Sequence, residues 1–191
     1  MKGMSAMQTT NKTKHLTEAA MMIALSTVLS LFTLFKMPFG GEVTLGCMVP
    51  ILFYSFRYPG KPALFMSFTC GILQLMLGSA NVAYGKTAFH YIAIMLLDYI
   101  LAYGILGFAG LYKSKKPFAM LLSSVSVILL RYIFHLVSGF LIWESLFGLP
   151  EGFTGAYWTY NLAYNSFVLI DGAIAVFLLF VLSPFFANKK H

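Results

Sequence analysis

The sequence has very few charged residues, too few to cover the surface of a water-soluble fold. Asp, Glu, Lys and Arg make up 10% of its 191 residues, whereas apolar residues make up 59% and the mean hydropathy is +0.80. Soluble domains carry about 25% charged residues, so the composition excludes a soluble globular protein. A membrane-spanning helix needs about 20 residues, and six such helices with their loops use nearly the whole chain. No separate catalytic or nucleotide-binding domain is therefore expected.

Cysteine is almost absent, and acidic residues are outnumbered by basic ones. Cys47 and Cys70 both lie in apolar stretches, where a thiol usually behaves as a small hydrophobe. We therefore expect neither a disulfide nor a metal site, and no cofactor. The net charge of +7 comes from short basic clusters between apolar runs. Such clusters are typical of membrane loops, so they predict a lipid bilayer, and not nucleic acid, as a partner of the chain.

The apolar runs predict an all-α integral membrane protein with six transmembrane helices. Residues 1–15 form a polar N-terminal segment, residues 16–187 hold the six-helix domain, and residues 188–191 form a short tail. Pro50 predicts that the second helix is short and kinked, because proline removes one backbone hydrogen bond. The predicted helices cover residues 16–35, 43–56, 62–77, 87–111, 117–143 and 156–185.

Lysine and arginine are distributed unevenly between alternate loops. One set of loops and termini holds ten of them, and the other holds only Lys36 and Lys86. Because loops rich in Lys and Arg stay on the cytoplasmic side, both termini are predicted to be cytoplasmic, in agreement with an even number of spans. The ten are Lys2, Lys12, Lys14, Arg57, Lys61, Lys113, Lys115, Lys116, Lys189 and Lys190.

Four ionisable residues lie deep within the apolar runs, at Asp98, Arg131, His135 and Asp171. Each costs a few kcal/mol or more in hydrocarbon, so each must face protein or a water-filled cavity. His135 follows Arg131 by four residues and shares its helix face, and Trp143 lies two turns further along much the same stripe. Asp171 lies deeper, and we assign it to packing between helices. All four are the first candidates for a site, and Asp171 is the one least expected to contact a ligand.

Two interpretations fit these residues. In the structural one, Arg131 and Asp98 form a buried pair, His135 bonds a carbonyl group, and Trp143 belongs to an interfacial aromatic belt. In the functional one, they bind a flat, nitrogen-rich, cationic ligand through hydrogen bonds and cation–π contacts. The polar and aromatic residues that accompany them are Tyr84, His90, Tyr91, Tyr99, Trp158, Tyr160, Tyr164 and Asn165.

Ala20 and Ala24 form a small-residue step on the first predicted helix. Small residues spaced by four allow another membrane helix to approach closely. The pattern leaves open whether that helix belongs to the same chain or to another protein.

In order and spacing, these segments resemble the thiamine-specific substrate-binding subunits (S components, ThiT type) of energy-coupling-factor (ECF) transporters, over nearly the whole chain. No single segment is specific, but their combination is. The segments are Leu16-Thr17-Glu18-Ala19-Ala20 with Ala24, Gly40-Gly41-Glu42-Val43, Pro50-Ile51, Ser55-Phe56-Arg57, Leu97-Asp98-Tyr99, Leu130-Arg131-Tyr132 with His135, Ser138-Gly139, Trp143, Tyr160 and Tyr164-Asn165.

The resemblance implies high-affinity capture of extracellular thiamine by a protein that is not an enzyme. Import is then driven by partners, namely a transmembrane coupling subunit and two ATPase subunits. Ala20 and Ala24 match the alanine motif that docks on the coupling subunit. The resemblance also implies a multi-pass protein of the bacterial plasma membrane whose binding site opens to the outside.

Individual binding residues follow from the same resemblance. Asp98 matches the acidic residue that contacts the aminopyrimidine ring of thiamine, and Tyr99 matches its neighbour. His135 and Trp143 match an imidazole and a stacking indole, and Arg131 matches a basic position that holds the acid in place.

The last predicted helix carries two further matches, Tyr160 and Asn165. The chain departs from the family at Gly40-Gly41, where some members place a tryptophan. The aromatic partner of the thiazolium ring is therefore left open. The candidates are Tyr84, Tyr91 and Trp158.

Two other functions remain as alternatives. One is an S component for another heterocyclic vitamin, although a neutral vitamin would not need Asp98 among aromatic residues. The other is an autonomous proton-coupled secondary transporter with Asp98, His135 and Asp171 as a relay; this predicts inverted repeats, which the sequence does not show convincingly. An intramembrane enzyme is disfavoured because no nucleophile with a base and an orienting group can be assembled.

Overall fold

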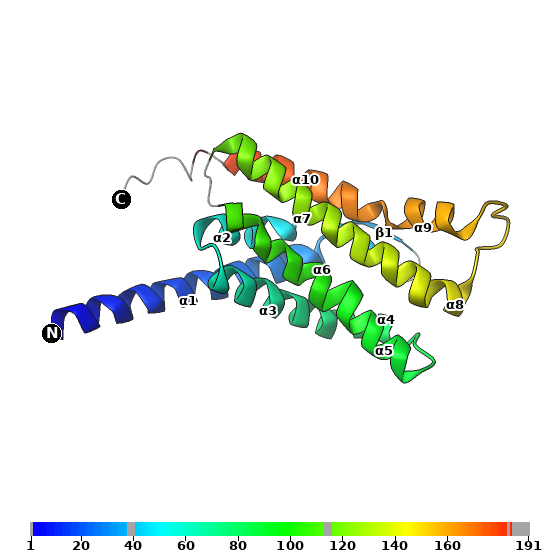
Figure 1. Ribbon diagram of the computed structural model, residues 1–191, viewed down its shortest axis with the longest axis horizontal. Coiled ribbons are helices and arrows are strands. Elements are labelled where there is room, and N and C mark those ends of the chain that lie inside the picture. Colours follow the sequence, from blue (N-terminus) through cyan, green and yellow to red (C-terminus); the bar gives the residue numbers. More distant parts are fainter. Residues whose placement is uncertain (1, 38–40, 113–115, 183, 185–191) are drawn as a thin grey trace.

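The computed structural model describes residues 2–37, 41–112, 116–182 and 184, and within the first helix it describes side chains from Thr13 onwards. Gly40, most of the basic loop after residue 112 and the predicted tail at 188–191 lie outside the described residues. Helices dominate the described chain (Figure 1). This is the expected outcome for long apolar runs, because a helix satisfies its backbone hydrogen bonds without water.

A short hairpin interrupts the predicted first and second helices. Helix α1 covers Lys2–Leu31, and strands β1 (Thr33–Lys36) and β2 (Glu42–Thr44) pair antiparallel after it. The prediction that residues 32–35 and 43–47 are helical is therefore wrong. β-branched and aromatic residues favour strands, and a cross-strand ion pair of 3.3 Å between Lys36 Nζ and Glu42 Oε1 joins the two strands.

The third predicted helix is close to the observed one, whereas the second begins five residues later than predicted, at Met48. Helix α2 covers Met48–Arg57 and α3 covers Lys61–Leu77. The prediction of a kink at Pro50 is wrong, because Pro50 lies in the first turn of α2. Backbone N–H groups in the first turn make no hydrogen bond within the helix, so a proline there removes none. Helix α2 is short, as predicted. At its far end Arg57 forms an ion pair of 2.9 Å with Glu18 of α1.

The fourth helical stretch changes its winding along its length. After the short helix α4 (Ser79–Val82), it starts with α5 (Ala88–Ile94), whose cap Thr87 accepts a hydrogen bond from the backbone N–H of His90. It continues through the π-helical segment η2, the helix α6 and the 3₁₀ segment η3. These three cover Met95–Ile100, Leu101–Gly104 and Ile105–Tyr112.

The last two helical stretches are also composite. Helix α7 (Pro117–Ser138) continues through the π-helical segment η4 (Gly139–Trp143) into α8 (Glu144–Phe147). Helix α9 (Tyr157–Asn165) is followed by α10 (Phe167–Leu182). The predicted fifth helix thus ends four residues later than expected.

Within the described residues, three helical stretches are long and apolar enough to cross a membrane, and α3 is a shorter apolar helix. The three are Ala88–Tyr112, Pro117–Phe147 and Tyr157–Leu182. The structure therefore agrees with a helical membrane protein. The number of six spans and their sidedness stay predictions. The start of α1 and the end of α10 lie at the same end of the molecule (Figure 1).

Glycines let the central helices pack closely at the middle of the bundle. A Cβ atom on Gly107 of η3 would lie 2.9 Å from the carbonyl oxygen of Ala63 in α3, and one on Gly110 would overlap the carbonyl oxygen of Ser55 in α2. Serine hydroxyl groups cross the same interfaces: Ser67 Oγ donates to the carbonyl of Gly104 at 3.1 Å. This is the small-residue packing expected of membrane helices.

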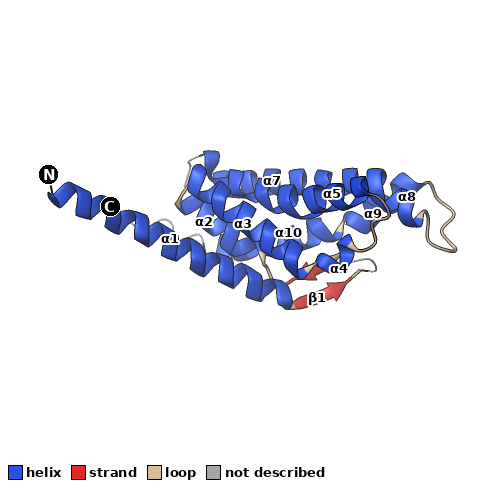
Figure 2. Cartoon of the chain, turned by 90° about the horizontal axis from the view of Figure 1, so that it is seen from below, coloured by secondary structure: helices blue, strands red, loops and turns tan. Residues whose placement is uncertain are grey.

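The largest apolar cluster lies in the half of the bundle nearer the start of α1, and two smaller apolar clusters lie in the other half. Met48, Ile51, Leu52, Met66 and Leu106 are fully buried in the largest cluster. The opposite end of the bundle carries the hairpin, α4 and α8 (Figures 1 and 2). We call it the hairpin end, and the cavity described next lies there.

Candidate ligand-binding cavity

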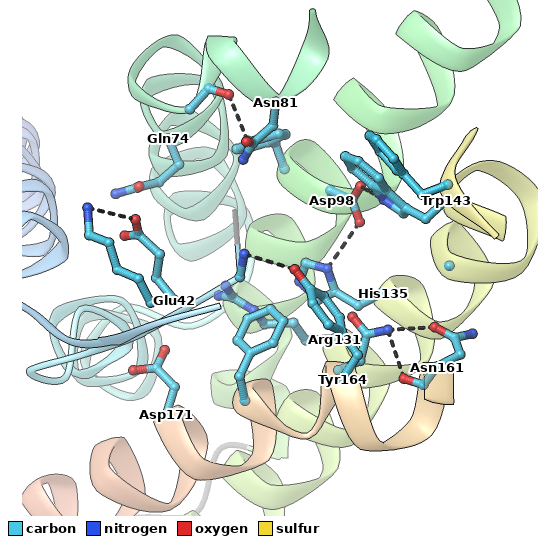
Figure 3. Close-up of a pocket in the computed structure, with 18 of the residues that line it drawn as sticks. Glu42, Gln74, Asn81, Asp98, Arg131, His135, Trp143, Asn161, Tyr164 and Asp171 are labelled. Atoms are coloured by element: carbon cyan, nitrogen blue, oxygen red, sulfur yellow. Dashed lines mark hydrogen bonds and ion pairs between the residues drawn. The ribbon is translucent and has the colours of Figure 1, made fainter. Parts of the chain in front are cut away.

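A cavity of about 570 Å³ opens at the hairpin end, between α3, η2, α7, α9, α10 and the hairpin (Figure 3). This volume is typical of sites for small organic molecules. Its wall includes ionisable side chains from four different elements: Glu42 from β2, Asp98 from η2, Arg131 and His135 from α7, and Asp171 from α10. Charged groups at this depth need partners or a polar ligand.

Asp98 is the centre of a hydrogen-bond cluster on one side of the cavity. Its Oδ2 atom accepts from Ser138 Oγ at 2.7 Å and from Trp143 Nε1 at 3.1 Å. Its Oδ1 atom lies 3.1 Å from His135 Nδ1. All three partners come from the stretch formed by α7 and η4. The carboxylate is thus held in one orientation while facing the cavity.

The π-helical segment η4 explains how Ser138 and Trp143 reach the same carboxylate. In an α-helix, residues five apart point in directions about 140° apart. The wider turn of η4, which starts at Gly139, brings Trp143 back toward the side of Ser138. Asp98 itself lies in the second π-helical segment, η2. Such segments are rare and frequently occur at functional sites.

His135 lines the cavity and has one ring nitrogen without a hydrogen-bond partner among the described residues. Its Nδ1 atom faces Asp98, while its Nε2 atom is buried and has no hydrogen-bond partner among the described residues. The imidazole lies 5.7 Å from the ring of Phe167, between ring centroids. The unused nitrogen can accept an N–H from a ligand when the imidazole is neutral, or donate when it is protonated.

Helix α9 contributes an asparagine pair. Asn161 Nδ2 donates to the carbonyl of Leu136 at 2.9 Å, which fastens α9 to α7. Asn165 Nδ2 donates to the Asn161 backbone carbonyl at 3.0 Å and to its Oδ1 at 2.7 Å. The side-chain carbonyl of Asn165 has no partner among the described residues, and Asn165 and Tyr160 both line the cavity. Asn161 therefore joins helices, whereas Asn165 has an acceptor left for a ligand.

The predicted aromatic residues divide into two groups. Trp143 lines the cavity and stacks on Phe147, with ring centroids 5.9 Å apart. Tyr84 packs edge-on behind Trp143 at 6.2 Å and is not part of the cavity wall. Tyr91 lies over Gly85, and Trp158 is 57% exposed; neither lines the cavity. The structure thus brings none of the three candidate partners of a thiazolium ring into the wall.

The structural interpretation and the family resemblance both predicted that Arg131 contacts Asp98, and this prediction is wrong. The guanidinium of Arg131 lies over the ring of Tyr103, 4.1 Å from the ring centroid, and the hydrogen bonds of Asp98 go to other residues. Arg131 is one helical turn from His135, so its side chain reaches α6 instead of η2. It remains part of the cavity wall.

Several lining residues were missed by sequence reasoning. Asp171, which we had assigned to packing, lines the cavity while its Oδ1 atom accepts from the backbone N–H and the hydroxyl of Thr44 at 2.9 and 2.8 Å. Tyr99, which the resemblance predicted, also lines the cavity, but its hydroxyl donates to the Gly78 carbonyl at 2.9 Å. The signal for the others was present as polar residues near apolar runs. They are Gln74, Asn81, Tyr103 and Tyr157.

A helical bundle of membrane-spanning composition, with a ligand-sized cavity lined by charged and aromatic groups, is the architecture of a membrane protein with a candidate site for a small organic molecule. The chain belongs to the thiamine transporter protein family (Thia_YuaJ), which matches residues 16–191. It is 31% identical over 188 residues to the thiamine transporter ThiT of Bacillus subtilis (strain 168), covering 89% of this chain and 92% of that protein. The expected family is therefore confirmed, and with it a role in thiamine uptake.

Proposed function

We propose that the chain captures thiamine from outside the cell as the substrate-binding subunit of an ECF-type importer. The observation that carries the proposal is the cluster of Asp98, His135 and Trp143 on the cavity wall. Thiamine joins an aminopyrimidine ring to a cationic thiazolium ring. A carboxylate and an unused imidazole nitrogen suit the amino group and ring nitrogens, and an indole face suits a flat cation.

The negative charge of Asp98 favours a cationic ligand in particular. In a partly desolvated cavity a carboxylate attracts a cation more strongly than it does in water. Asn165 adds one neutral acceptor to the same wall. A neutral heterocyclic vitamin would leave the charge of Asp98 uncompensated, which argues for thiamine over other vitamins of similar size.

The energy for import is assigned to partner subunits. Ala20 and Ala24 are both exposed on α1, on the side that does not pack against α2. A helix of a transmembrane coupling subunit can approach α1 closely there, and two ATPases then drive the coupling subunit. The cluster around Asp98 and the exposed surface at Ala20 and Ala24 lie on different elements. Mutations can therefore separate ligand binding from docking.

Titration of the purified protein in detergent with thiamine tests the binding step. We expect quenching of the Trp143 fluorescence at submicromolar ligand, together with a calorimetric heat. The variant Trp158→Phe should keep the quenching, because Trp158 is 57% exposed and away from the cavity; Trp143→Phe should lose it. The absence of both quenching and heat at micromolar thiamine would contradict the proposal.

A further inference from the structure

Glu18 and Arg57 lie in two of the segments that resemble the family, yet neither residue lines the cavity. The fold brings them together at the end of the bundle away from the hairpin, one from α1 and the other from the last residue of α2. Arg57 Nε lies 2.9 Å from Glu18 Oε2, and Arg57 Nη2 donates to Glu18 Oε1 at 3.2 Å. The guanidinium therefore contacts both oxygens of the carboxylate.

This ion pair has better geometry than most surface pairs. The side chains of Arg57 and Glu18 are only 25% and 23% exposed, and a bidentate contact fixes the direction between two groups as well as their distance. Tyr58 reinforces the contact, because its hydroxyl accepts from Arg57 Nε at 3.2 Å. Its ring also lies 4.2 Å from the imidazole of His15 on α1, between ring centroids. The end of α2 is thus joined to one turn of α1 by polar and aromatic contacts.

Few apolar side chains hold α1 against the rest of the bundle. Among the residues of α1 whose side chains are described, Ala19 is the only apolar one that is buried. The others that pack against the core are partly buried. About two turns beyond Glu18, Ser26 Oγ donates to the carbonyl of Cys47, just before α2, at 2.7 Å. Because one buried methyl group contributes little, the polar contacts of Glu18 and Ser26 decide which face of α1 turns toward α2.

The same two contacts fix the direction in which Ala20 and Ala24 point. Glu18 precedes Ala20 by two residues. Ser26 follows Ala24 by two residues, and two residues of an α-helix turn a side chain through about 200°. Each alanine therefore lies on the side of α1 opposite to its neighbouring polar contact, and both alanines are exposed. Rotation of α1 by the angle of one residue would bring larger side chains such as Met21, which is 61% exposed, onto this side instead.

We propose that the ion pair between Arg57 and Glu18 is a positioning contact for docking, which holds α1 in the rotation that presents Ala20 and Ala24 to the coupling subunit. The inference rests on the proposed function, because that function makes the two exposed alanines a docking surface. Arg57 acts through α1 and need not touch the partner. Loss of the pair should therefore weaken docking and leave the capture of thiamine intact.

The single variants Arg57→Gln and Glu18→Gln test this contact, because each removes one charge and keeps a polar side chain. Each purified variant should bind thiamine with wild-type affinity. Each should bind the purified complex of coupling subunit and ATPases severalfold more weakly, because α1 has the docking rotation for a smaller fraction of the time. Lys61→Gln is the matched control, since it removes an exposed cation at the start of α3 and should preserve both affinities.

The double variant Glu18→Arg with Arg57→Glu separates positioning from a general loss of stability. It restores the ion pair with the charges exchanged, so it should dock and support uptake better than either single variant. Wild-type docking by Arg57→Gln would overturn the inference. Recovery of the thermal unfolding midpoint in the double variant without recovery of docking would overturn it too, and so would a loss of thiamine affinity that matches the loss of docking in the single variants.

Ala20→Leu, which enlarges a residue of the docking surface itself, distinguishes failure of this inference from failure of the proposed function. Weak docking of Ala20→Leu together with wild-type docking of Arg57→Gln would keep the docking surface and remove only the positioning role of Arg57. A wild-type protein that binds thiamine but does not bind the coupling complex would contradict the proposed function itself.

Discussion

At the scale of single residues, Asp98 is the central group of the candidate site. Its carboxylate is oriented by Ser138, Trp143 and His135, so the group that we propose contacts the ligand does not have to reorganise on binding. Preorganised contacts of this kind convert more of their interaction into affinity. The charge of Asp98 can be tested apart from the shape of its side chain, because asparagine at this position has nearly the same shape as aspartate and no charge.

The substitution Asp98→Asn should weaken thiamine binding by about 1 to 3 kcal/mol, the range for a charge-assisted hydrogen bond lost from a desolvated site. Titration calorimetry with purified protein measures this loss. Glu144→Gln is the matched control, because it removes a carboxylate at the same end of the bundle from a residue outside the cavity wall. Unchanged affinity in Asp98→Asn would make Asp98 a structural residue.

At the scale of residues, sequence reasoning found the groups whose chemistry is unusual for a membrane helix. Asp98, His135 and Trp143 stood out because a charged or indole side chain in an apolar run needs a reason. Gln74 carries no charge and lies near the end of its helix, so its only signal is that it is a polar residue in an apolar run. The residue that Arg131 contacts depends on how the helices pack against one another, and a single sequence does not contain that information.

At the scale of elements, glycine sets how closely the cavity-forming helices approach. A Cβ atom on Gly139, at the start of η4, would overlap the side-chain amide of Asn161 in α9. That amide fastens α9 to α7 through its bond to the carbonyl of Leu136. The contact therefore supports both the helix packing and the position of Asn165.

The substitution Gly139→Ala should destabilise the protein by about 1 to 3 kcal/mol, the usual cost of overpacking, and should also weaken thiamine binding. The midpoint of thermal unfolding in detergent checks the first effect. Gly155→Ala is the control, since the nearest atoms to its new Cβ belong to the side chain of Phe153 in an exposed loop; its midpoint should not change. Equal behaviour of the two variants would show that the α7–α9 contact tolerates a methyl group.

Elements were predicted best where one signal is strong. The starts of α3 and α7 were placed to within one residue because Lys and Pro open a long, mainly apolar stretch there, and the end of α3 was placed because a polar loop begins at Gly78. The hairpin was missed because its strands have only three and four residues and lie in apolar sequence. Over so few residues, the alternation of side chains typical of a strand cannot be distinguished from a helical pattern. The segments η2 and η4 depend on packing between helices, which leaves no pattern in the chain.

At the scale of the whole molecule, α1 separates two surfaces. One face packs on α2 through buried residues such as Ala19 and Ser26, whose hydroxyl donates to the Cys47 carbonyl at 2.7 Å. The opposite face carries Ala20 and Ala24 and is exposed. The cavity residues come from other elements, so a change on the exposed face should not alter the site.

The substitution Ala20→Leu should leave thiamine affinity unchanged and strongly reduce uptake, because the larger side chain prevents close approach of a partner helix. Binding is measured with purified protein, and uptake with labelled thiamine in cells that also produce the coupling subunit and the ATPases. Ser126→Leu makes a similar enlargement at an exposed position of α7 and should preserve both. Normal uptake by Ala20→Leu would place the docking surface elsewhere.

The unused polar atoms of Arg131 and His135 also have a consequence for the lifetime of the protein. They raise the free energy of the folded chain whenever the cavity holds no ligand, and a ligand that bonds them stabilises only the folded state. The empty protein is thus the form closest to unfolding and the one most accessible to proteases. Vitamin supply is thereby expected to influence how long each copy survives in the membrane, in addition to how much vitamin it delivers.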